Sequence, residues 1–279
     1  MSGRVIDAET GLPISNVDMA ASFQYEGDMA WANTDGDGNY TLAGLPTGVF
    51  QILARSDRYL DQETALKVEV AGAAVTADFA LSQGATISGR VIDADTGLPI
   101  ARAGIEARSE SNDHQSNVYA DTDADGHFSL QGVAAGSYRI EAKAFEQGYI
   151  LQYYDNTIFS GLAKVVTVAE TDVIEDISFE LRRGATIIGT VTDARTGLPI
   201  ANVGLGAGPQ NGGHLTWDET RDDGSYTLRG IPTGIIEVEA SIDGYIDQTS
   251  TVGVRDTGVA YRLDIALDIG ATISGYVFD

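Results

Sequence analysis

The architecture follows from Gly89-Arg90-Val91-Ile92-Asp93-Ala94-Asp95-Thr96-Gly97-Leu98-Pro99-Ile100, in which an alternating strand pattern runs into the turn Thr-Gly-Leu-Pro-Ile. The same turn recurs at 10–14 and 196–200. The glycine that opens the segment has counterparts at 3, 189 and 275, so the steps along the chain are 86, 100 and 86 residues. Regular spacing of this kind indicates three full repeats followed by the first strand of a fourth.

Each repeat then shows a second turn and strand-like alternation. The second turn is Asp-Gly, at 37–38, 125–126 and 223–224, and an aromatic residue and a leucine follow it. Apolar residues recur with period 2, as at Tyr138, Ile140 and Ala142, and no segment holds a helical stripe. We therefore expect an all-β fold: a tandem array of three antiparallel, Ig-like, seven-stranded β-sandwiches plus an extra C-terminal strand.

The repeats divide the chain into four parts. Residues 1–83 form the first sandwich, whose first strand is truncated, and residues 84–183 form the second, with an insertion at about 150–163. Residues 184–269 form the third sandwich, and 270–279 are either the first strand of a fourth repeat or a donor strand. Joints of only about three residues leave little freedom, so we expect a semi-rigid rod.

Charge and composition exclude several classes of function. The 279 residues include 17 basic and 41 acidic ones, giving a formal net charge of −24, and there is no cysteine. Such a chain is repelled by polyanions, so nucleic acid is not an expected partner. No apolar run is long enough to span a membrane in this segment, and disulfide or thiolate chemistry is absent.

Three ordered motifs give the chain a family resemblance. They are Gly-x-Val-x-Asp-x-x-Thr-Gly-x-Pro-Ile, Thr-Asp-x-Asp-Gly-x-Tyr/Phe-x-Leu and Gly-Leu-Pro-x-Gly-x-Phe. In this order they resemble the carboxypeptidase regulatory-like domain, although repeat 2 has Val133-Ala134-Ala135-Gly136 in place of the last motif. The resemblance implies a transthyretin-like β-sandwich, common in tandem on secreted bacterial and archaeal proteins, that serves display, spacing or adhesion without catalysis.

Calcium binding is one candidate chemistry. The second turn of repeat 2 presents oxygens at alternate positions before a glycine, as the start of a calcium loop does. Position 12, where a bidentate glutamate belongs, is glycine in every repeat, so a hairpin turn capped by aspartate is the competing interpretation. No cofactor is required, and Ca²⁺ is the alternative, with the candidate ligands Asn33, Asp35, Asp37, Asp121, Asp123 and Asp125.

Aromatic residues form the second candidate site. Trp31, Tyr119 and Trp217 each lie seven residues before the turn glycine, and the alternation indicates that their rings point outward. With acids on the same face they could stack on cell-surface glycans, whereas cross-strand packing or contact between domains is the alternative. Tyr153 and Tyr154 of the insertion either contact a partner or fold over the sandwich.

No residues are assigned to catalysis. His114, His127 and His214 are unrelated in spacing, and no metal-binding or nucleophile motif places a base beside them. We therefore expect that the chain is not an enzyme.

The two ends of the chain lead to the functional hypothesis. Repeat 1 lacks the Gly-Ala-Thr-Ile that opens repeats 2 and 3, whereas 270–279 carries it. Either a longer array continues here, or this strand pairs with a neighbouring copy, which would assemble filaments head to tail. The residues of such an assembly strand are Ile273, Tyr276, Val277 and Phe278.

The resulting hypothesis is a non-enzymatic, extracellular or cell-surface module. It acts as a stalk, spacer or filament segment whose partners are adjacent repeats or further copies of the chain. The alternative is an adhesion module that binds carbohydrate or calcium.

Overall fold

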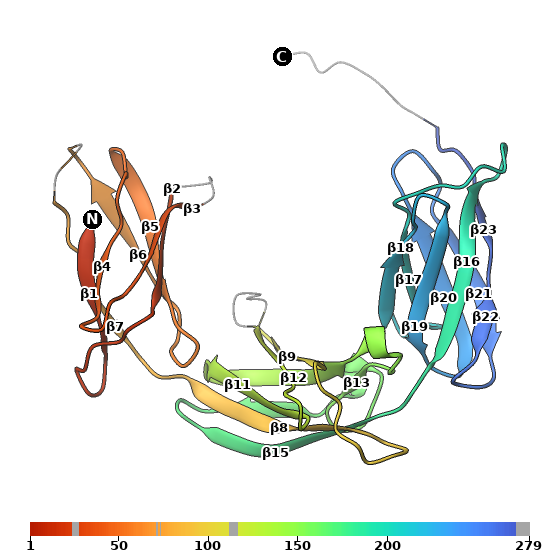
Figure 1. The fold of residues 1–279 in the computed structure, drawn as a ribbon, viewed down its shortest axis with the longest axis horizontal. Helices are drawn as coiled ribbons and strands as arrows, with labels where there is room; N and C mark the ends of the chain where they lie inside the picture. Colours follow the sequence, from red (N-terminus) through yellow and green to blue (C-terminus); the bar gives the residue numbers. More distant parts are fainter. Residues whose placement is uncertain (24–27, 71, 73, 112–116, 272–279) are drawn as a thin grey trace.

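The structure, a computed structural model, describes residues 1–23, 28–70, 72, 74–111 and 117–271. Within these ranges the regular elements are strands, together with two short 3-10 turns, η2 (Phe145–Gln147) and η3 (Ser160–Leu162). The strands build three sandwiches, each of two sheets (Figure 1). The expectation of tandem β-sandwiches is confirmed. The predicted assembly residues Ile273, Tyr276, Val277 and Phe278 lie outside the described residues.

The first sandwich pairs a three-stranded sheet, in the order β4-β1-β7, with a four-stranded sheet, in the order β3-β2-β5-β6. Apolar residues alternate along these strands, so Phe50 and Ile52 are buried while Gln51 between them is exposed. The strands are β1 (Ser2–Asp7), β2 (Asp18–Phe23), β3 (Asp28–Asn33), β4 (Asn39–Thr41), β5 (Gly48–Arg55), β6 (Gln62–Val68) and β7 (Phe79–Leu81).

The second sandwich repeats this plan with one change at a sheet edge. Its sheets run β11-β8-β15 and β10-β9-β12-β13, and β14 also pairs with β12. The predicted insertion divides the edge strand into β13 and β14, whereas the third sandwich has one continuous strand there. The strands are β8 (Ala85–Asp93), β9 (Gly104–Ser109), β10 (Val118–Asp121), β11 (His127–Val133), β12 (Gly136–Lys143), β13 (Gln152–Tyr153), β14 (Val165–Val168) and β15 (Val173–Leu181).

The third sandwich has the same two layers. Its sheets run β19-β16-β22, with β23 also paired with β16, and β18-β17-β20-β21. The strands are β16 (Ala185–Asp193), β17 (Gly204–Pro209), β18 (Thr216–Glu219), β19 (Ser225–Ile231), β20 (Gly234–Ser241), β21 (Gln248–Val254), β22 (Ala260–Arg262) and β23 (Ile265–Leu267).

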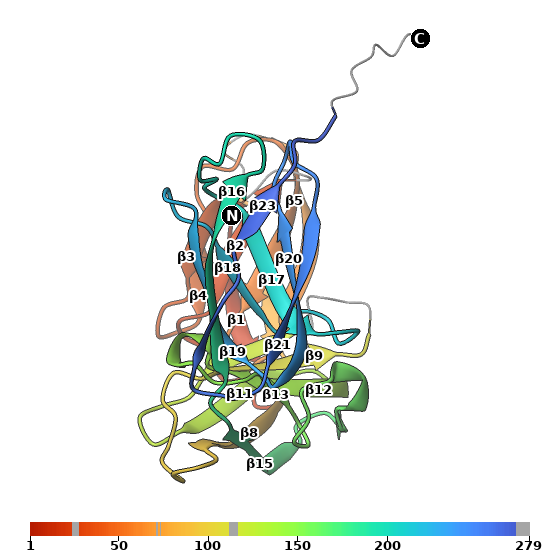
Figure 2. The same cartoon turned by 90° about the vertical axis from the view of Figure 1, so that its right-hand side faces the viewer.

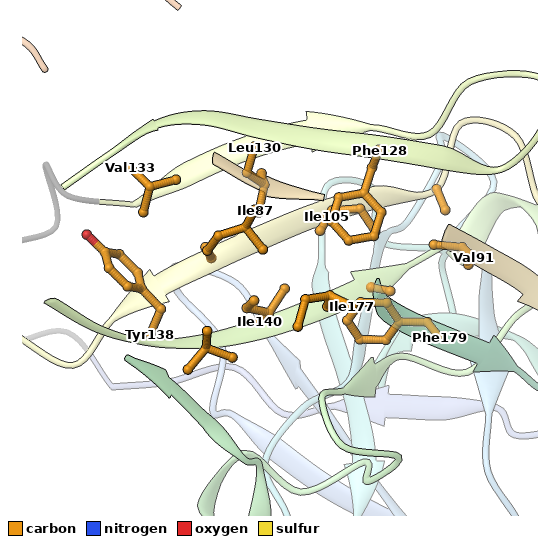
Figure 3. Packing of buried hydrophobic residues seen from close by; sticks show 14 of the residues in the cluster. Ile87, Val91, Ile105, Phe128, Leu130, Val133, Tyr138, Ile140, Ile177 and Phe179 are labelled. Atoms are coloured by element: carbon orange, nitrogen blue, oxygen red, sulfur yellow. The ribbon is translucent and has the colours of Figure 1, made fainter. Parts of the chain in front are cut away.

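Each sandwich has its own hydrophobic core between its two sheets. In the second sandwich, Phe128 and Phe179 from one sheet face Ile105 and Ile140 from the other (Figure 3). The two phenyl rings lie 6.2 Å apart in a tilted arrangement. Apolar burial of this kind is the main favourable term in folding, and each sandwich contains its own share of it.

The first and last strands of each sandwich pair in parallel, which corrects the expectation of wholly antiparallel sheets. β1 pairs with β7, β8 with β15, and β16 with both β22 and β23, all in parallel register. Two parallel neighbours run toward the same end of a sheet. The chain therefore enters a sandwich at one end and leaves it at the other, and this is how consecutive sandwiches are joined.

The repeated glycine of the first strand is required by this pairing. A Cβ on Gly189 would lie 1.8 Å from the carbonyl oxygen of Leu263, just before β23. A Cβ on Gly3 would likewise lie 1.8 Å from the carbonyl oxygen of Ala77, and a Cβ on Gly89 would lie 1.8 Å from that of Ile177. Only a residue without a side chain lets the last strand approach so closely.

The predicted rod is wrong in shape. The chain changes direction at each joint, and the three sandwiches form a U with the second at its base (Figure 1). Figure 2, seen from the side, places the first and third sandwiches one behind the other above the second. The larger sheets, with β2 and β3, β9 and β12, and β17 and β18, face the inside of the U.

Gly189→Ala is expected to lower the unfolding free energy of the third sandwich by about 2–3 kcal/mol or more, because the new methyl group meets a backbone carbonyl that cannot move aside. Calorimetry of the whole chain measures this as a lowered transition of one sandwich. The control is Gly253→Ala in β21, where a Cβ meets nothing within 4 Å. Equal effects of the two substitutions would contradict the close approach.

Candidate functional site

The joints between sandwiches are the feature that the three repeats share most closely. At the first joint the amide of Gly84 donates to the carbonyl of Arg58 at 3.0 Å, and the amide of Leu60 donates to Ser82 at 2.9 Å. The linker is thus a short antiparallel bridge against the loop that follows β5. The second joint repeats it with Gly184 to Gly148 and Ile150 to Arg182. The segment that follows the third sandwich makes the same bridge, with Gly270 to Gly244 and Ile246 to Asp268.

A buried aspartate at the end of each first strand holds this loop in place. In the second sandwich, Oδ1 of Asp93 accepts the amides of Asp95 at 3.0 Å and Thr96 at 2.8 Å. Its Oδ2 accepts the hydroxyl of Tyr149 at 2.7 Å, and Tyr149 belongs to the bridged loop. Asp7 with Tyr59, and Asp193 with Tyr245, make the same bond at 2.9 and 3.1 Å.

The linker residue beside the aspartate differs between joints. At the first joint, Nε2 of Gln83 donates to Oδ2 of Asp7 at 3.0 Å. At the second joint, Arg183 lies over the ring of Tyr149, 4.7 Å from its centroid, and its Nε lies 3.7 Å from Oδ2 of Asp93. The linker is therefore bonded to the first strand as well as to the loop.

These bonds favour the ionised carboxylates. The hydroxyl of Tyr149, together with the amides of the turn, lowers the pKa of Asp93 to about 2. The amide of Thr10 and the side chain of Gln83 lower the pKa of Asp7, and the amide of Thr196 lowers that of Asp193. A depressed carboxylate pKa means that folding is stabilised by the charged form.

The next sandwich docks on the same loop through a glycine with positive φ. Gly230, at φ 70°, lies so close that a Cβ would stand 2.2 Å from the carbonyl oxygen of Tyr149. A Cβ on Gly132 would likewise lie 2.9 Å from the carbonyl oxygen of Tyr59 in the first sandwich. Gly44 is the equivalent residue of the first sandwich, and a Cβ there meets nothing within 4 Å among the described residues.

The second joint has further contacts that the first lacks among the described residues. The ring of Phe145 in η2 meets the indole of Trp217 edge to face, with centroids 6.3 Å apart. Nη1 of Arg229 in β19 lies 3.9 Å from Oε2 of Glu146 in η2. These contacts connect η2 of the second sandwich to both sheets of the third, at β18 and β19.

The aspartates predicted to bind calcium have structural partners in their turns. Oδ1 of Asp35 accepts the amides of Asp37 and Asn39 at 3.0 and 2.8 Å, and the amide of Asn39 lowers the pKa of Asp35. Oδ1 of Asp123 accepts the amides of Asp125 and His127 at 2.9 and 2.8 Å.

The remaining candidate ligands lie in the strands before these turns. The side-chain nitrogen Nδ2 of Asn33 donates to Oδ1 of Asp18 on the neighbouring strand, and Asp121 lies in β10 opposite Gly104. Across the described ranges no three histidine or carboxylate side chains are grouped so as to hold a metal ion.

The three aromatic residues lie on the outer faces of the larger sheets, as the alternation indicates. Trp31 is 78 % exposed, Tyr119 63 % and Trp217 58 %. Their directly opposite neighbours differ: Ala20, Glu106 and Gly206 respectively. The structure therefore places the rings at equivalent positions but in different surroundings.

The two insertion tyrosines lie against the second sandwich. The ring of Tyr154 meets Phe179 edge to face at 6.3 Å, and Nζ of Lys164 lies 5.2 Å from its centroid. Burial, followed by the charge of Glu141, raises the pKa of Tyr153 to about 12. Both rings are thus used within the sandwich, although Tyr154 and Tyr153 remain partly accessible.

A charge cluster on the outer face of the second sandwich was not anticipated from the sequence. Glu106 and Glu141 are directly opposite each other on β9 and β12 and are 3 % and 1 % exposed. Nζ of Lys143 lies 2.7 and 2.8 Å from them, and Arg108 lies 3.0 and 3.1 Å from them. Burial opposes the charge of Glu106, but Lys143 and Tyr119 outweigh it and lower its pKa. The signal in the sequence was the matched alternation of acid and base on two adjacent strands.

The histidines are not brought together. His127 begins β11 in the second sandwich, whereas His214 precedes β18 in the third, with Nε2 3.3 Å from Oε2 of Glu239. His114 lies outside the described residues.

Comparison with known proteins is consistent with three units of one kind. The family model described as the carboxypeptidase regulatory-like domain matches residues 1–82, 86–175 and 186–268. The chain belongs to the carboxypeptidase regulatory-like domain family. The joints described above are thus contacts between consecutive carboxypeptidase regulatory-like domains, and the resemblance seen in the sequence is confirmed. No curated protein matches the chain.

The solved structures that match the chain have low sequence identity and low TM-scores. The Bacillus anthracis TIE protein is 14 % identical with a TM-score of 0.29, and the match covers 95 % of this chain and 50 % of that one. A streptococcal ancillary pilin is 12 % identical with a TM-score of 0.30, covering 97 % and 99 %. The major pilin subunit BcpA of Bacillus cereus is 9 % identical with a TM-score of 0.28, covering 97 % and 99 %. In the described part of the chain, no helix is long and apolar enough to cross a membrane.

Asp93→Asn is expected to lower the thermal midpoint of the second carboxypeptidase regulatory-like domain by roughly 5–15 °C, because the bonds from Tyr149 and the turn amides lose their charged acceptor. The carboxylate stabilises the fold fully above its unfolded pKa of about 4, and the effect is lost as the pH falls toward 2. Calorimetry should therefore show the difference between wild type and variant shrinking from pH 4 to pH 2. Asp95→Asn, whose side chain is 68 % exposed, is the control, and an equal loss there would contradict the assignment.

Proposed function

We propose that the chain is a non-enzymatic spacer segment of an extracellular or cell-surface protein, which holds consecutive domains in fixed relative positions. The units are residues 1–83, 84–183 and 184–269. The observation that carries the proposal is the joint, in which a three-residue linker is hydrogen-bonded to the preceding loop while a glycine of the next domain rests on that loop.

The form of the joints supports spacing rather than flexible tethering. A linker of three residues already leaves little freedom, and here both amide and carbonyl groups of the linker are also used in the bridge. The strongly acidic surface, at a net charge of −24, keeps such an array in water. Membership of the carboxypeptidase regulatory-like family is in keeping with an accessory, non-catalytic role.

A finer proposal concerns assembly of several copies. Residues 270–279 repeat the opening of the second and third units, so this segment of one copy could pair with the edge of the next and build a filament head to tail. Electron microscopy of the chain with and without 270–279 tests the proposal. Filaments that persist after deletion would rule out the strand as the link.

The stiffness of the second joint can be measured directly, because the absence of cysteine lets spin labels be placed at will. With labels on Ser129→Cys and Thr251→Cys, we expect a narrow distance distribution in the otherwise unchanged chain. Phe145→Ala removes the ring contact to Trp217, worth about 0.5–1.5 kcal/mol, and should raise the population of undocked arrangements about two- to tenfold.

The matched control for this experiment is Trp31→Ala. It removes an exposed ring of the first domain, far along the chain from the second joint. A broad distribution in the unchanged chain, or no broadening with Phe145→Ala, would contradict a fixed joint.

A second candidate function is adhesion through carbohydrate or calcium. The exposed rings of Trp31, Tyr119 and Trp217 favour carbohydrate, since flat aromatic surfaces at the water boundary suit sugar rings. A glycan array tests this role. For calcium, a titration followed by thermal unfolding is the test: a site built from the turn aspartates must raise the melting temperature, and an unchanged temperature would remove calcium.

A further inference from the structure

The outer face of the third domain is hollowed where the other two are filled. Along the central strand β17, Gly204, Gly206 and Gly208 alternate on the outward face. The equivalent residues are Asp18, Ala20 and Ser22 in β2, and Gly104, Glu106 and Arg108 in β9. The missing side chains leave an open hollow of about 610 Å³ over β17.

Side chains from the neighbouring strands form the walls of the hollow. Gly206 lies opposite Trp217 of β18 on one side and Glu239 of β20 on the other. One step along, Gly204 lies opposite Glu219 and Ser241. The hollow therefore has bare backbone at Gly204, one aromatic wall and carboxylates on both sides.

The loop before β18 closes one end. A Cβ on Gly208 would lie 1.9 Å from the carbonyl oxygen of Gly213, so this loop folds back over the strand. The imidazole of His214 then rests on Gly206, where a Cβ would lie 2.4 Å from Nδ1. Nε2 of His214 meets Oε2 of Glu239 at 3.3 Å, and Leu215, which follows, is buried.

The indole wall is supported from behind. Phe145 of the second domain meets Trp217 edge to face at 6.3 Å, which holds the indole while leaving it 58 % exposed. Trp31 and Tyr119 occupy the same position in the other domains, but opposite them stand Ala20 and Glu106, whose side chains occupy the floor. A ring that is supported by a residue of the preceding domain is thus particular to the third domain within the described residues.

The negative charge of the residues that line the hollow favours a cationic ligand. Glu219 and Glu239 contribute carboxylates, whereas the carboxylate of Asp218 accepts the amide of Thr227 in β19. The lining residues include neither lysine nor arginine. Tryptophan is the best aromatic partner for a cation, and nearby carboxylates add to the attraction. Anionic ligands are repelled both here and by the chain as a whole, with its net charge of −24.

The shape of the hollow selects a ring. A lysine side chain would fill little of 610 Å³, whereas one or two sugar rings fit the usual range of ligand sites. A sugar ring can lie flat against Trp217 over the bare backbone of Gly204, and its hydroxyl groups can bond Ser241 and His214. A protonated amine on the sugar would meet the carboxylates.

We propose that this hollow binds an amino sugar with a free, protonated amine, its ring against Trp217 and its ammonium group against Glu219 and Glu239. The inference rests on the second candidate function, adhesion to carbohydrate, and names its sugar class and its residues. The spacer role of the joints is independent of it.

The test uses Trp31→Phe as the parent chain, so that Trp217 is the single tryptophan and its fluorescence reports on the hollow. A free-amine glucosamine trisaccharide should change the fluorescence saturably, and the fully N-acetylated trisaccharide should bind about tenfold more weakly or worse. Equal binding of the two would overturn recognition of the ammonium group while leaving carbohydrate adhesion in place.

Two variants locate the site, and the first has a matched control on the same strand. Glu239→Gln should weaken binding about tenfold, whereas Glu237→Gln, on the same strand and face but outside the hollow, should leave it unchanged. Gly204→Val should abolish binding without unfolding the domain, because its Cβ meets only the carbonyl oxygen of Ser241, at 3.7 Å. Equal losses with the two glutamine variants, or no binding of either trisaccharide, would overturn the site.

Discussion

The parallel pairing of the first and last strands is the constraint on which the rest of the molecule depends. It sends the chain into each sandwich at one end and out at the other, so that domains can follow one another without a return loop. The pairing in turn requires a glycine at the point of closest approach, as at Gly189 against Leu263. The glycine therefore recurs in the first strand of each sandwich because each sandwich makes this same contact.

At each joint, one aspartate has several structural roles. Asp93 ends the first strand, caps the turn that follows it, and binds Tyr149 of the loop on which the next domain rests. One carboxylate thereby links the fold of a domain to its position relative to the next. The edge-to-face contact between Phe145 and Trp217 strengthens the second joint. The same contact supports the aromatic wall of the hollow in the third domain.

The tandem sandwiches could be predicted from the sequence, whereas strand direction and the contacts on the sheet surfaces could not. Alternation and repeated turns predicted the tandem sandwiches, because those patterns are local. The parallel pairing of β8 with β15 was missed, since strand direction within a sheet depends on contacts about 90 residues apart. The burial of Glu106 and Glu141 could not be predicted for the same reason: only the strand register shows that they lie directly opposite each other. The bend of the array was likewise missed, because it arises from the bridge between linker and loop.

The paired terminal strands also determine how the array responds to tension. In the second domain the chain arrives at Ala85 and departs after Leu181, at opposite ends of one hydrogen-bonded ladder. Stretching the chain therefore slides β8 along β15 and strains all of the bonds of the ladder at once, whereas an antiparallel pair would open one bond at a time from its end. Forced unfolding is governed by the rate of crossing that barrier and not by equilibrium stability. In a chain without cysteine, this shear geometry is what resists extension.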